Sequence, residues 1–248
     1  MNVRLSVVVA AAALLVACAH APPRNPIASW VPSSNFDERR PQVIVLHYTE
    51  QDSVQRSLDT LRSANAGGRV SSHYLVGDDG RIYQLVSDQH RAWHAGAGRW
   101  GTIADLNSAS IGIEIDNDGR EPYTEAQFAA LVTLLQDLTT RLRIPRTQVI
   151  GHSDLAPTRK IDPGPHFPWQ RLAQAGFGAW PADGAAAAPA GFDGWMAMAR
   201  IGYDIGDRAA ALRAFRMRFR ARDDGPGLAP ELDAEDLRIL HALSGGPG

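Results

Sequence analysis

The chain has 248 residues, which is room for one large domain or for a medium domain with a small one. Its 44% hydrophobic and 21% charged residues are ordinary for a globular protein, and the formal net charge of −2 gives no strong positive field, so no nucleic-acid partner is expected. A single cysteine, Cys18, excludes an intramolecular disulfide, and Lys160 is the only lysine.

The N-terminal segment has the features of an export signal. Arg4 precedes the apolar run Leu5–Val16, which is too short to cross a bilayer as a helix and ends just before Cys18. The segment resembles a bacterial lipoprotein signal in which residues 1–17 are removed and Cys18 is lipidated; a plain signal peptide with an incidental cysteine is the alternative. We therefore expect a lipid anchor in the outer membrane, facing the periplasm, followed by a proline-rich tether over residues 18–35.

Strand and helix patterns are mixed between residues 36 and 180. The short apolar run Val43–Leu46 predicts a buried strand, and Thr124 with Gln127 forms a capping box that begins a helix with an apolar stripe. The predicted elements, in chain order, are a strand at 43–46, a helix at 53–62, strands at 72–76 and 81–86 around a turn at 77–80, a strand at 110–115, a helix at 124–142 and a strand at 149–150. This pattern predicts an α/β or α+β domain.

The C-terminal part of the chain differs in composition. Residues 181–191 are rich in alanine, glycine and proline, which predicts a linker. Three short helical patterns follow within residues 192–248, and Asp207 and Asp233 are suited to cap two of them. The arginines of the second pattern, at positions 213, 216, 218, 220 and 222, are most simply explained as a solvated helix face. We expect a small C-terminal module of three helices.

Two histidines and one aspartate are the candidate metal ligands. His47 follows one predicted buried strand, His152 follows another, and Asp162 lies in the proline-rich loop after His152. A catalytic zinc ion takes three such ligands and keeps a fourth position open for water. On spacing alone, each histidine can equally be a structural or surface residue, so the set is a hypothesis at this point.

A metal-bound water also needs a base and an oxyanion partner. Glu114 projects from the polar face of the strand at 110–115, beside Gly112, and is the candidate general base. Lys160 precedes Asp162 by two positions, so in an extended loop both side chains point the same way. We expect Lys160 to stabilise the oxyanion.

Five ordered motifs carry a resemblance to a known family. They are residues 43–49 (VIVLHYT), 70–76 (VSSHYLV), 92–96 (AWHAG), 110–115 (SIGIEI) and 151–165 (GHSDLAPTRKIDPGP). Together they resemble the zinc-dependent N-acetylmuramoyl-L-alanine amidases (amidase type 2, related to peptidoglycan-recognition proteins). Within the family, the chain is most similar to the lipoprotein members. The resemblance covers roughly residues 36–175 and implies a catalytic domain over residues 36–180.

The resemblance implies a fold, a reaction and a site. The fold is a mixed central sheet with helices on its faces, and the reaction is hydrolysis of the amide between the lactyl group of N-acetylmuramic acid and L-alanine of the stem peptide, in peptidoglycan or anhydro-muropeptides. One Zn²⁺ per chain is implied at His47, His152 and Asp162, with Glu114 and Lys160 as catalytic residues. The alternative is a non-catalytic peptidoglycan-recognition protein, against which the intact set of five residues argues.

Several further residues are candidates for substrate contact. Trp93 and His94 lie on a loop that suits sugar or peptide binding, and Arg69 and Asn107 are placed to hold stem-peptide carboxylates unless they are ordinary loop residues. His73 is either a residue of the cleft or a hydrogen-bonded structural histidine. The C-terminal helices resemble, more weakly, a small peptidoglycan-binding module; a helical cap packed on the catalytic domain is the alternative.

Overall fold

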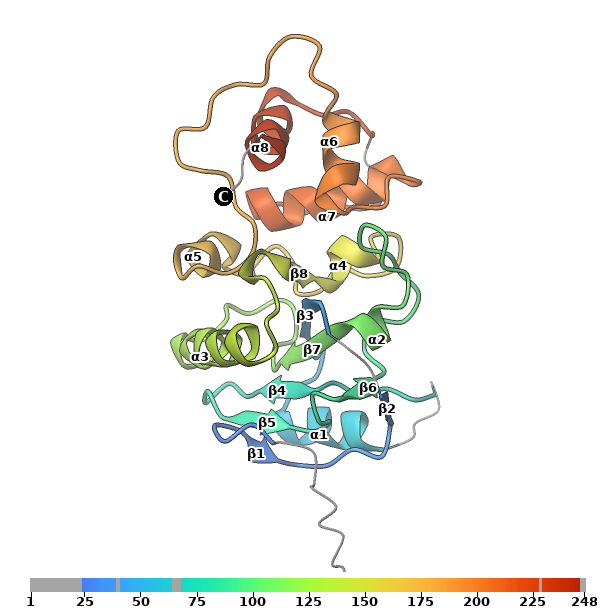
Figure 1. The fold of residues 1–248 in the computed structure, drawn as a ribbon, viewed down its shortest axis with the longest axis vertical. Helices are drawn as coiled ribbons and strands as arrows, with labels where there is room; N and C mark the ends of the chain where they lie inside the picture. The colour runs from blue at the N-terminus through green and yellow to red at the C-terminus, as the bar shows by residue number, and fades with distance from the viewer. Residues whose placement is uncertain (1–23, 39–40, 64–67, 228, 246–248) are drawn as a thin grey trace, which may run out of the picture.

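The structure is a computed structural model that describes residues 24–38, 41–63, 68–227 and 229–245. Its centre is a six-stranded sheet with the strand order β1-β5-β4-β7-β3-β8 (Figure 1). The strands of this sheet are β1 (Ser29–Trp30), β3 (Val43–Tyr48), β4 (Tyr74–Val76), β5 (Ile82–Gln84), β7 (Ser110–Ile115) and β8 (Val149–Gly151). β3 is parallel to β7 and β8, whereas β4 is parallel to β7 and antiparallel to β5. The expected mixed α/β fold is confirmed.

The remaining elements surround this sheet. A small antiparallel sheet pairs β2 (Phe36–Glu38) with β6 (His90–Ala92). The helices are α1 (Val54–Arg62), α2 (Leu106–Ala109), α3 (Glu125–Arg141), the 3-10 helix η1 (Arg146–Gln148), α4 (His152–Leu155), α5 (Trp169–Gln174), α6 (Gly194–Ile201), α7 (Arg208–Arg220) and α8 (Ala234–Ser244).

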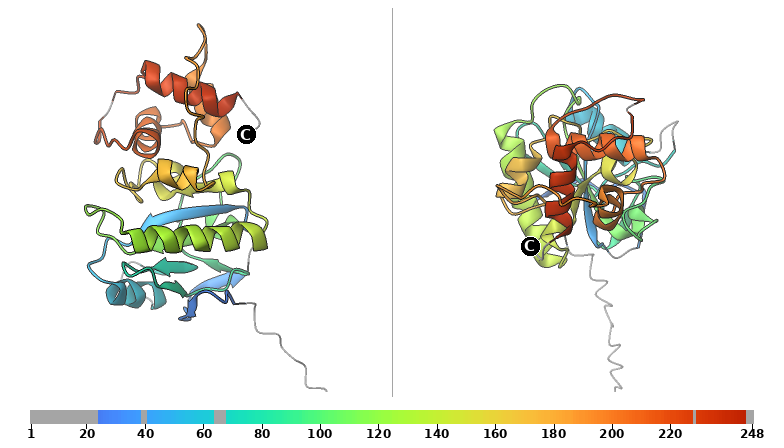
Figure 2. Two further views of the ribbon diagram at one scale, coloured as in Figure 1. Left: turned by 90° about the vertical axis from the view of Figure 1, so that its left-hand side faces the viewer. Right: turned by 90° about the horizontal axis from the view of Figure 1, so that it is seen from above.

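Helix α3 lies across one face of the sheet (Figure 2). The Thr124 side chain accepts from the Gln127 backbone N–H and the Gln127 side chain accepts in return, so the predicted capping box is confirmed. The buried side chain of Leu138 packs in one cluster with Ile113 of β7. Because side chains alternate along a strand, the neighbouring Glu114 faces the opposite side of the sheet.

That opposite side is covered at its two ends. At the β5 end, Leu58 of α1 packs with Leu75 and its neighbours. At the β8 end, Val45 of β3 belongs to one buried cluster with Phe215 of α7. His47 lies on this side of the sheet because it follows Val45 by two positions. Helices α1 and α7 therefore lie on either side of His47.

For two of the five arginines expected on a solvated helix face, Arg216 and Arg218, the sequence interpretation is wrong. Arg216 and Arg218 are each only 4% exposed. Arg216 pairs with the buried Asp236 of α8, and Arg218 pairs with the buried Asp154 of α4. A guanidinium can leave water in this way only when a carboxylate compensates its charge. Arg218 thus joins α7 to the strand-and-helix core.

The segment expected to form a tether is packed against the sheet in its described part. β1 pairs with β5, and the buried Asn25 donates from Nδ2 to Asp137 of α3 at 2.9 Å. These contacts shorten any free tether at its C-terminal end. The predicted signal peptide and Cys18 lie outside the described residues.

Candidate active site

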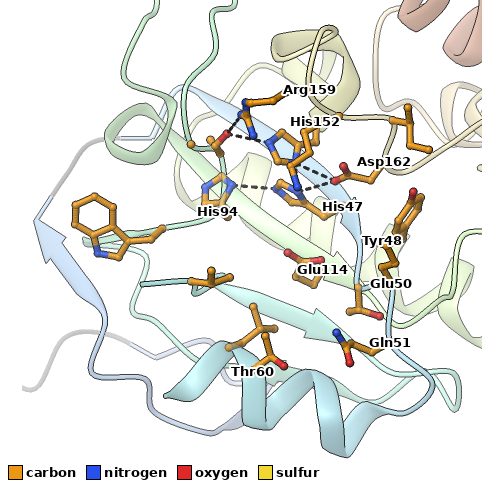
Figure 3. A pocket seen from close by; sticks show the side chains of 18 of the residues that line it. His47, Tyr48, Glu50, Gln51, Thr60, His94, Glu114, His152, Arg159 and Asp162 are labelled. Carbon is orange, nitrogen blue, oxygen red and sulfur yellow. Dashed lines mark hydrogen bonds and ion pairs between the residues drawn. The ribbon is translucent and has the colours of Figure 1, made fainter. Parts of the chain in front are cut away.

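Three side chains that can bind a metal meet at the ends of two neighbouring parallel strands (Figure 3). His47 lies near the end of β3, and His152 begins α4 directly after β8; the pairing of these strands brings the two residues side by side. The loop after α4 returns Asp162 to the same place. His47 Nδ1 lies 3.0 Å from His152 Nδ1 and 2.9 Å from Asp162 Oδ2, and His152 Nδ1 lies 3.0 Å from that oxygen.

The second ring nitrogen of His152 is held by the backbone of a loop. His152 Nε2–H donates to the Ala95 carbonyl at 2.9 Å. Arg159 donates to the same carbonyl at 2.8 Å and also to the Ala97 carbonyl. The Nδ1 lone pair of His152 therefore faces His47 and Asp162, and the bond from Nε2 to the Ala95 carbonyl fixes the orientation of the ring.

The second ring nitrogen of His47 is held by a relay of side chains. The Ser110 hydroxyl donates to a carbonyl of α2, so it accepts from His94 Nε2–H at 3.2 Å. His94 Nδ1 is then an acceptor, and His47 Nε2–H donates to it at 3.0 Å. His47 consequently also presents its Nδ1 lone pair to the site.

The charge states of these groups suit metal binding. Burial, followed by the neighbouring His152, lowers the pKa of His47 from 6.5 to about 4, although Asp162 opposes this change. Burial alone would raise the pKa of Asp162, but the two imidazoles hold it well below its usual range. His47 is therefore neutral and Asp162 ionised near pH 7, which are the states in which these groups bind a metal.

The spacing of the three atoms fits a single ion. Two imidazole lone pairs and a carboxylate oxygen at 2.9 to 3.0 Å repel one another unless a cation lies between them. A tetrahedral ion with bonds of about 2.0–2.1 Å separates its ligand atoms by roughly 3.3 Å. Among the described residues, His47, His152 and Asp162 form a cluster that could hold a metal, and all three are buried.

Glu114 and Lys160 lie beside this cluster. Glu114 pairs in register with His47 across β3 and β7. Burial raises the pKa of Glu114 well above its usual range; the charge of Asp162 raises it further, and that of Lys160 opposes the change. Lys160 is half-buried and lines the same cavity. The structure thus brings together the five residues that the sequence suggested.

A cavity of about 800 Å³ opens over the cluster. Three of the expected substrate contacts, Arg69, Trp93 and His94, line it. The Arg69 guanidinium lies 6.0 Å from the centre of the Trp93 ring. Arg213 of α7 also lines the cavity, so the C-terminal helices form part of its wall.

Two other expected contacts are structural instead. Asn107 is only 6% exposed, and its Oδ1 accepts from the backbone N–H groups of His94 and Ala95, so it fixes the loop that orients His47 and His152. His73 is fully buried, with Nδ1 accepting from the Gly112 N–H and Nε2 donating to a carbonyl of β6. Neither side chain is placed to touch a substrate.

The sequence analysis did not propose two nearby arginines as residues of the site. Arg159 supports the loop behind His152, and its position beside Lys160 in the longest motif was an available signal. Arg213 reaches the cavity from α7, and no local pattern distinguishes it from its neighbouring arginines.

Comparison with known proteins gives a consistent result. The family model described as N-acetylmuramoyl-L-alanine amidase matches residues 37–165. N-acetylmuramoyl-L-alanine amidase AmiD of Escherichia coli K12 is 39% identical over 237 residues, which cover 82% of each chain. This similarity therefore extends beyond the matched family segment into the C-terminal helices.

Solved structures agree with this comparison. E. coli AmiD in complex with anhydro-N-acetylmuramic acid-L-Ala-D-γ-Glu-L-Lys has a TM-score of 0.70 at 38% identity, covering 83% of this chain and 89% of that chain. AmpDh3 of Pseudomonas aeruginosa in complex with an anhydromuramic pentapeptide has a TM-score of 0.68 at 31% identity, covering 93% of this chain and 97% of that chain. With its fold, its buried cluster of two histidines and one aspartate, and its sequence all in agreement, the chain belongs to the N-acetylmuramoyl-L-alanine amidase family.

Proposed function

We propose that the chain hydrolyses the amide between the lactyl group of N-acetylmuramic acid and L-alanine of the stem peptide, with one Zn²⁺ at His47, His152 and Asp162. The observation that carries this proposal is the convergence of three ligand atoms beside Glu114, at the floor of a cavity. Two imidazoles and one carboxylate with an open side are a donor set of catalytic zinc sites. The muropeptide fragments bound to AmiD and AmpDh3 support peptidoglycan and its anhydro-muropeptides as the substrate class.

Each residue of the site has a distinct task in this proposal. A zinc ion held there supplies a Lewis acid that polarises the scissile carbonyl and acidifies water. Glu114 takes the proton from the attacking water and delivers it to the departing amino group of L-alanine; its raised pKa suits both steps. Lys160 places a positive charge in the same cavity, where it stabilises the developing oxyanion.

Substrate binding is assigned to the wall of the cavity. Trp93 offers an aromatic surface to the sugar or peptide, and the exposed Arg69 beside it can pair with a stem-peptide carboxylate through two hydrogen bonds. His94 is only 8% exposed and bonds to His47, so we assign it mainly to orienting that ligand.

Digestion of purified muropeptides tests the reaction. We expect separated sugar and peptide products by mass spectrometry, loss of activity in a chelator, and recovery on addition of zinc. Products cut within the peptide, or activity that persists without metal, would contradict the proposal.

The role of Glu114 is tested by Glu114→Gln. This variant removes the proton acceptor but no metal ligand, so turnover should fall by at least about 100-fold while zinc content stays near one equivalent. Glu50→Gln is the matched control, because Glu50 is an exposed carboxylate of the same cavity and should retain near-normal turnover. Loss of zinc from Glu114→Gln would instead make Glu114 a ligand.

We further propose that the mature chain is anchored through lipid on Cys18 in the outer membrane, facing the periplasm. The support is the apolar run that ends at the sole cysteine. No helix among the described residues has the length and apolarity needed to span a bilayer. Cys18→Ser should move the protein from the membrane fraction to the soluble fraction; retention on membranes would contradict the lipid anchor.

A further inference from the structure

A buried carboxylate from α4 connects the metal cluster to the C-terminal helices. Asp154 is 0% exposed and lies two residues after His152. It accepts from the Gly151 backbone N–H at 2.8 Å, from the Tyr203 hydroxyl at 2.5 Å and from Arg218 Nη1 at 2.6 Å. The turn that carries His152 is therefore fixed by one bond from its own backbone and two from the C-terminal part of the chain.

Arg218 holds the chain on both sides of His152. One end of its guanidinium pairs with Asp154, and Nη2 donates to the Val149 carbonyl of β8 at 3.1 Å. The guanidinium carbon also lies 4.5 Å from the centre of the Trp169 ring. A planar side chain with several fixed donors can span these sites together, which a lysine cannot do.

The hydrogen bond from Tyr203 is equally well defined. Burial and the charge of Asp154 raise the pKa of Tyr203 well above 10, although Arg218 opposes the change, so the hydroxyl keeps its proton and donates. The ring of Tyr203 packs edge-on against Trp100, with ring centres 5.2 Å apart. This packing fixes the direction in which the hydroxyl points.

Apolar contacts reinforce the same connection. Leu155, the last residue of α4, and Ala156, which follows it, belong to one buried cluster with Leu212 and Phe215 of α7. The short helix α4 has only 4 residues and cannot hold its own position through internal hydrogen bonds. Its position therefore depends on what packs against it.

We propose that Arg218 and Tyr203 are positioning residues, through which the C-terminal helices set the place of His152 in the metal cluster. This inference rests on the zinc site proposed above. It gives the C-terminal helices a part in metal affinity, in addition to any contact that they make with peptidoglycan.

Zinc affinity of the metal-free chain tests the proposal independently of turnover. In competition with a chromogenic chelator at 25 °C, Arg218→Met should raise the zinc Kd by about 10-fold or more, as expected when a group that supports a ligand is lost. Tyr203→Phe keeps the ring and removes one hydrogen bond, so it should raise the Kd by a smaller factor. Arg218→Lys should recover only part of the loss, because it keeps the charge but not both contacts.

Arg216→Met is the matched control. Arg216 is also 4% exposed and pairs with the buried Asp236, but its hydrogen-bond and ion-pair partners among the described residues all lie within the C-terminal part of the chain. Its loss should lower the melting temperature while leaving the zinc Kd unchanged. Circular dichroism identifies any variant that fails to fold, and in that case Tyr203→Phe decides the question.

The outcomes separate this proposal from the proposed function. If the wild-type chain binds no zinc, the metal site itself is wrong. If the wild type binds zinc and both Tyr203→Phe and folded Arg218→Met bind it equally well, only the positioning role is overturned. Equal losses of affinity in the Arg216→Met and Arg218→Met variants would also overturn it, because the effect would then follow general destabilisation.

Discussion

Gly112 shows how closely single residues determine this site. A Cβ atom at position 112 would lie 2.4 Å from Cγ of His94, which is far closer than any ordinary contact. Only glycine therefore leaves room for the imidazole that orients His47. In the sequence Gly112 stands two positions before Glu114; in the structure, the ring of His94 fills the space that a side chain at position 112 would need.

The buried His47 makes the metal-free protein sensitive to acid. Its folded pKa of about 4 lies below the ordinary 6.5, so on acidification the unfolded chain takes up a proton before the folded chain does. The contribution of His47 to the unfolding free energy is therefore fully present above pH 6.5 and is lost as the pH falls toward 4. Between pH 7 and pH 5, we expect His47 to account for roughly 2 kcal/mol of lost unfolding free energy.

Urea unfolding of metal-free protein at these two pH values checks this expectation. His47→Gln should flatten the pH dependence by about that amount. His166→Gln, at an exposed position outside the cluster, should leave it unchanged. An equal pH dependence in all three proteins would show that His47 keeps an ordinary pKa in the folded state.

The sequence suggested the ligands but not what supports them. His47 and His152 could be proposed because each follows a recognisable strand, and Asp162 because it lies in the proline-rich loop after His152. That their Nδ1 atoms meet depends on the parallel pairing of β3 with β8, which no local pattern encodes. Arg218 was misinterpreted for the same reason: its partner Asp154 is distant in sequence, and α7 in isolation looks like a charged surface helix.

At the scale of elements, α3 illustrates a prediction that rests on local chemistry. The Thr124 hydroxyl accepts from the Gln127 N–H at 3.1 Å and donates to the Asp78 carbonyl at 2.8 Å. Thr124→Ala should therefore lower the unfolding free energy by about 1 kcal/mol in urea titrations. Thr133→Ala, in the exposed interior of the same helix, should change it by less than about 0.5 kcal/mol. Equal stability of the two variants would argue against the cap.

The sequence predicts the elements that have strong local signals, but it does not predict those that depend on partners distant in the chain. The hairpin around Gly80 was predicted because Asp-Gly accepts the positive φ of 79° found there. The two-residue strand β1 has no alternation of its own and exists only because β5 lies beside it. Residues 72 and 73, predicted as strand, precede β4; the His73 backbone nevertheless bonds to both Gly112 and Leu85.

At the scale of the whole molecule, the C-terminal helices share a core with the sheet. Val45 and Ile150 pack in one buried cluster with Leu212 and Phe215, and the ion pair of Arg218 crosses the same boundary. We therefore expect one cooperative thermal transition, with equal calorimetric and van't Hoff enthalpies for the metal-free chain. Two resolved transitions would instead indicate that residues 192–248 fold as an independent module.

The contact between Arg218 and Val149 also bears on folding while the chain is being synthesised. β8 is the last strand of the sheet, and an uncovered strand edge is a template for pairing with another chain. The side chain that occupies the Val149 carbonyl comes from α7, which leaves the ribosome only after every strand has been made. Until then the edge stays open to mispairing, so protection from aggregation arrives late in synthesis, and premature termination before α7 would yield a chain prone to self-association.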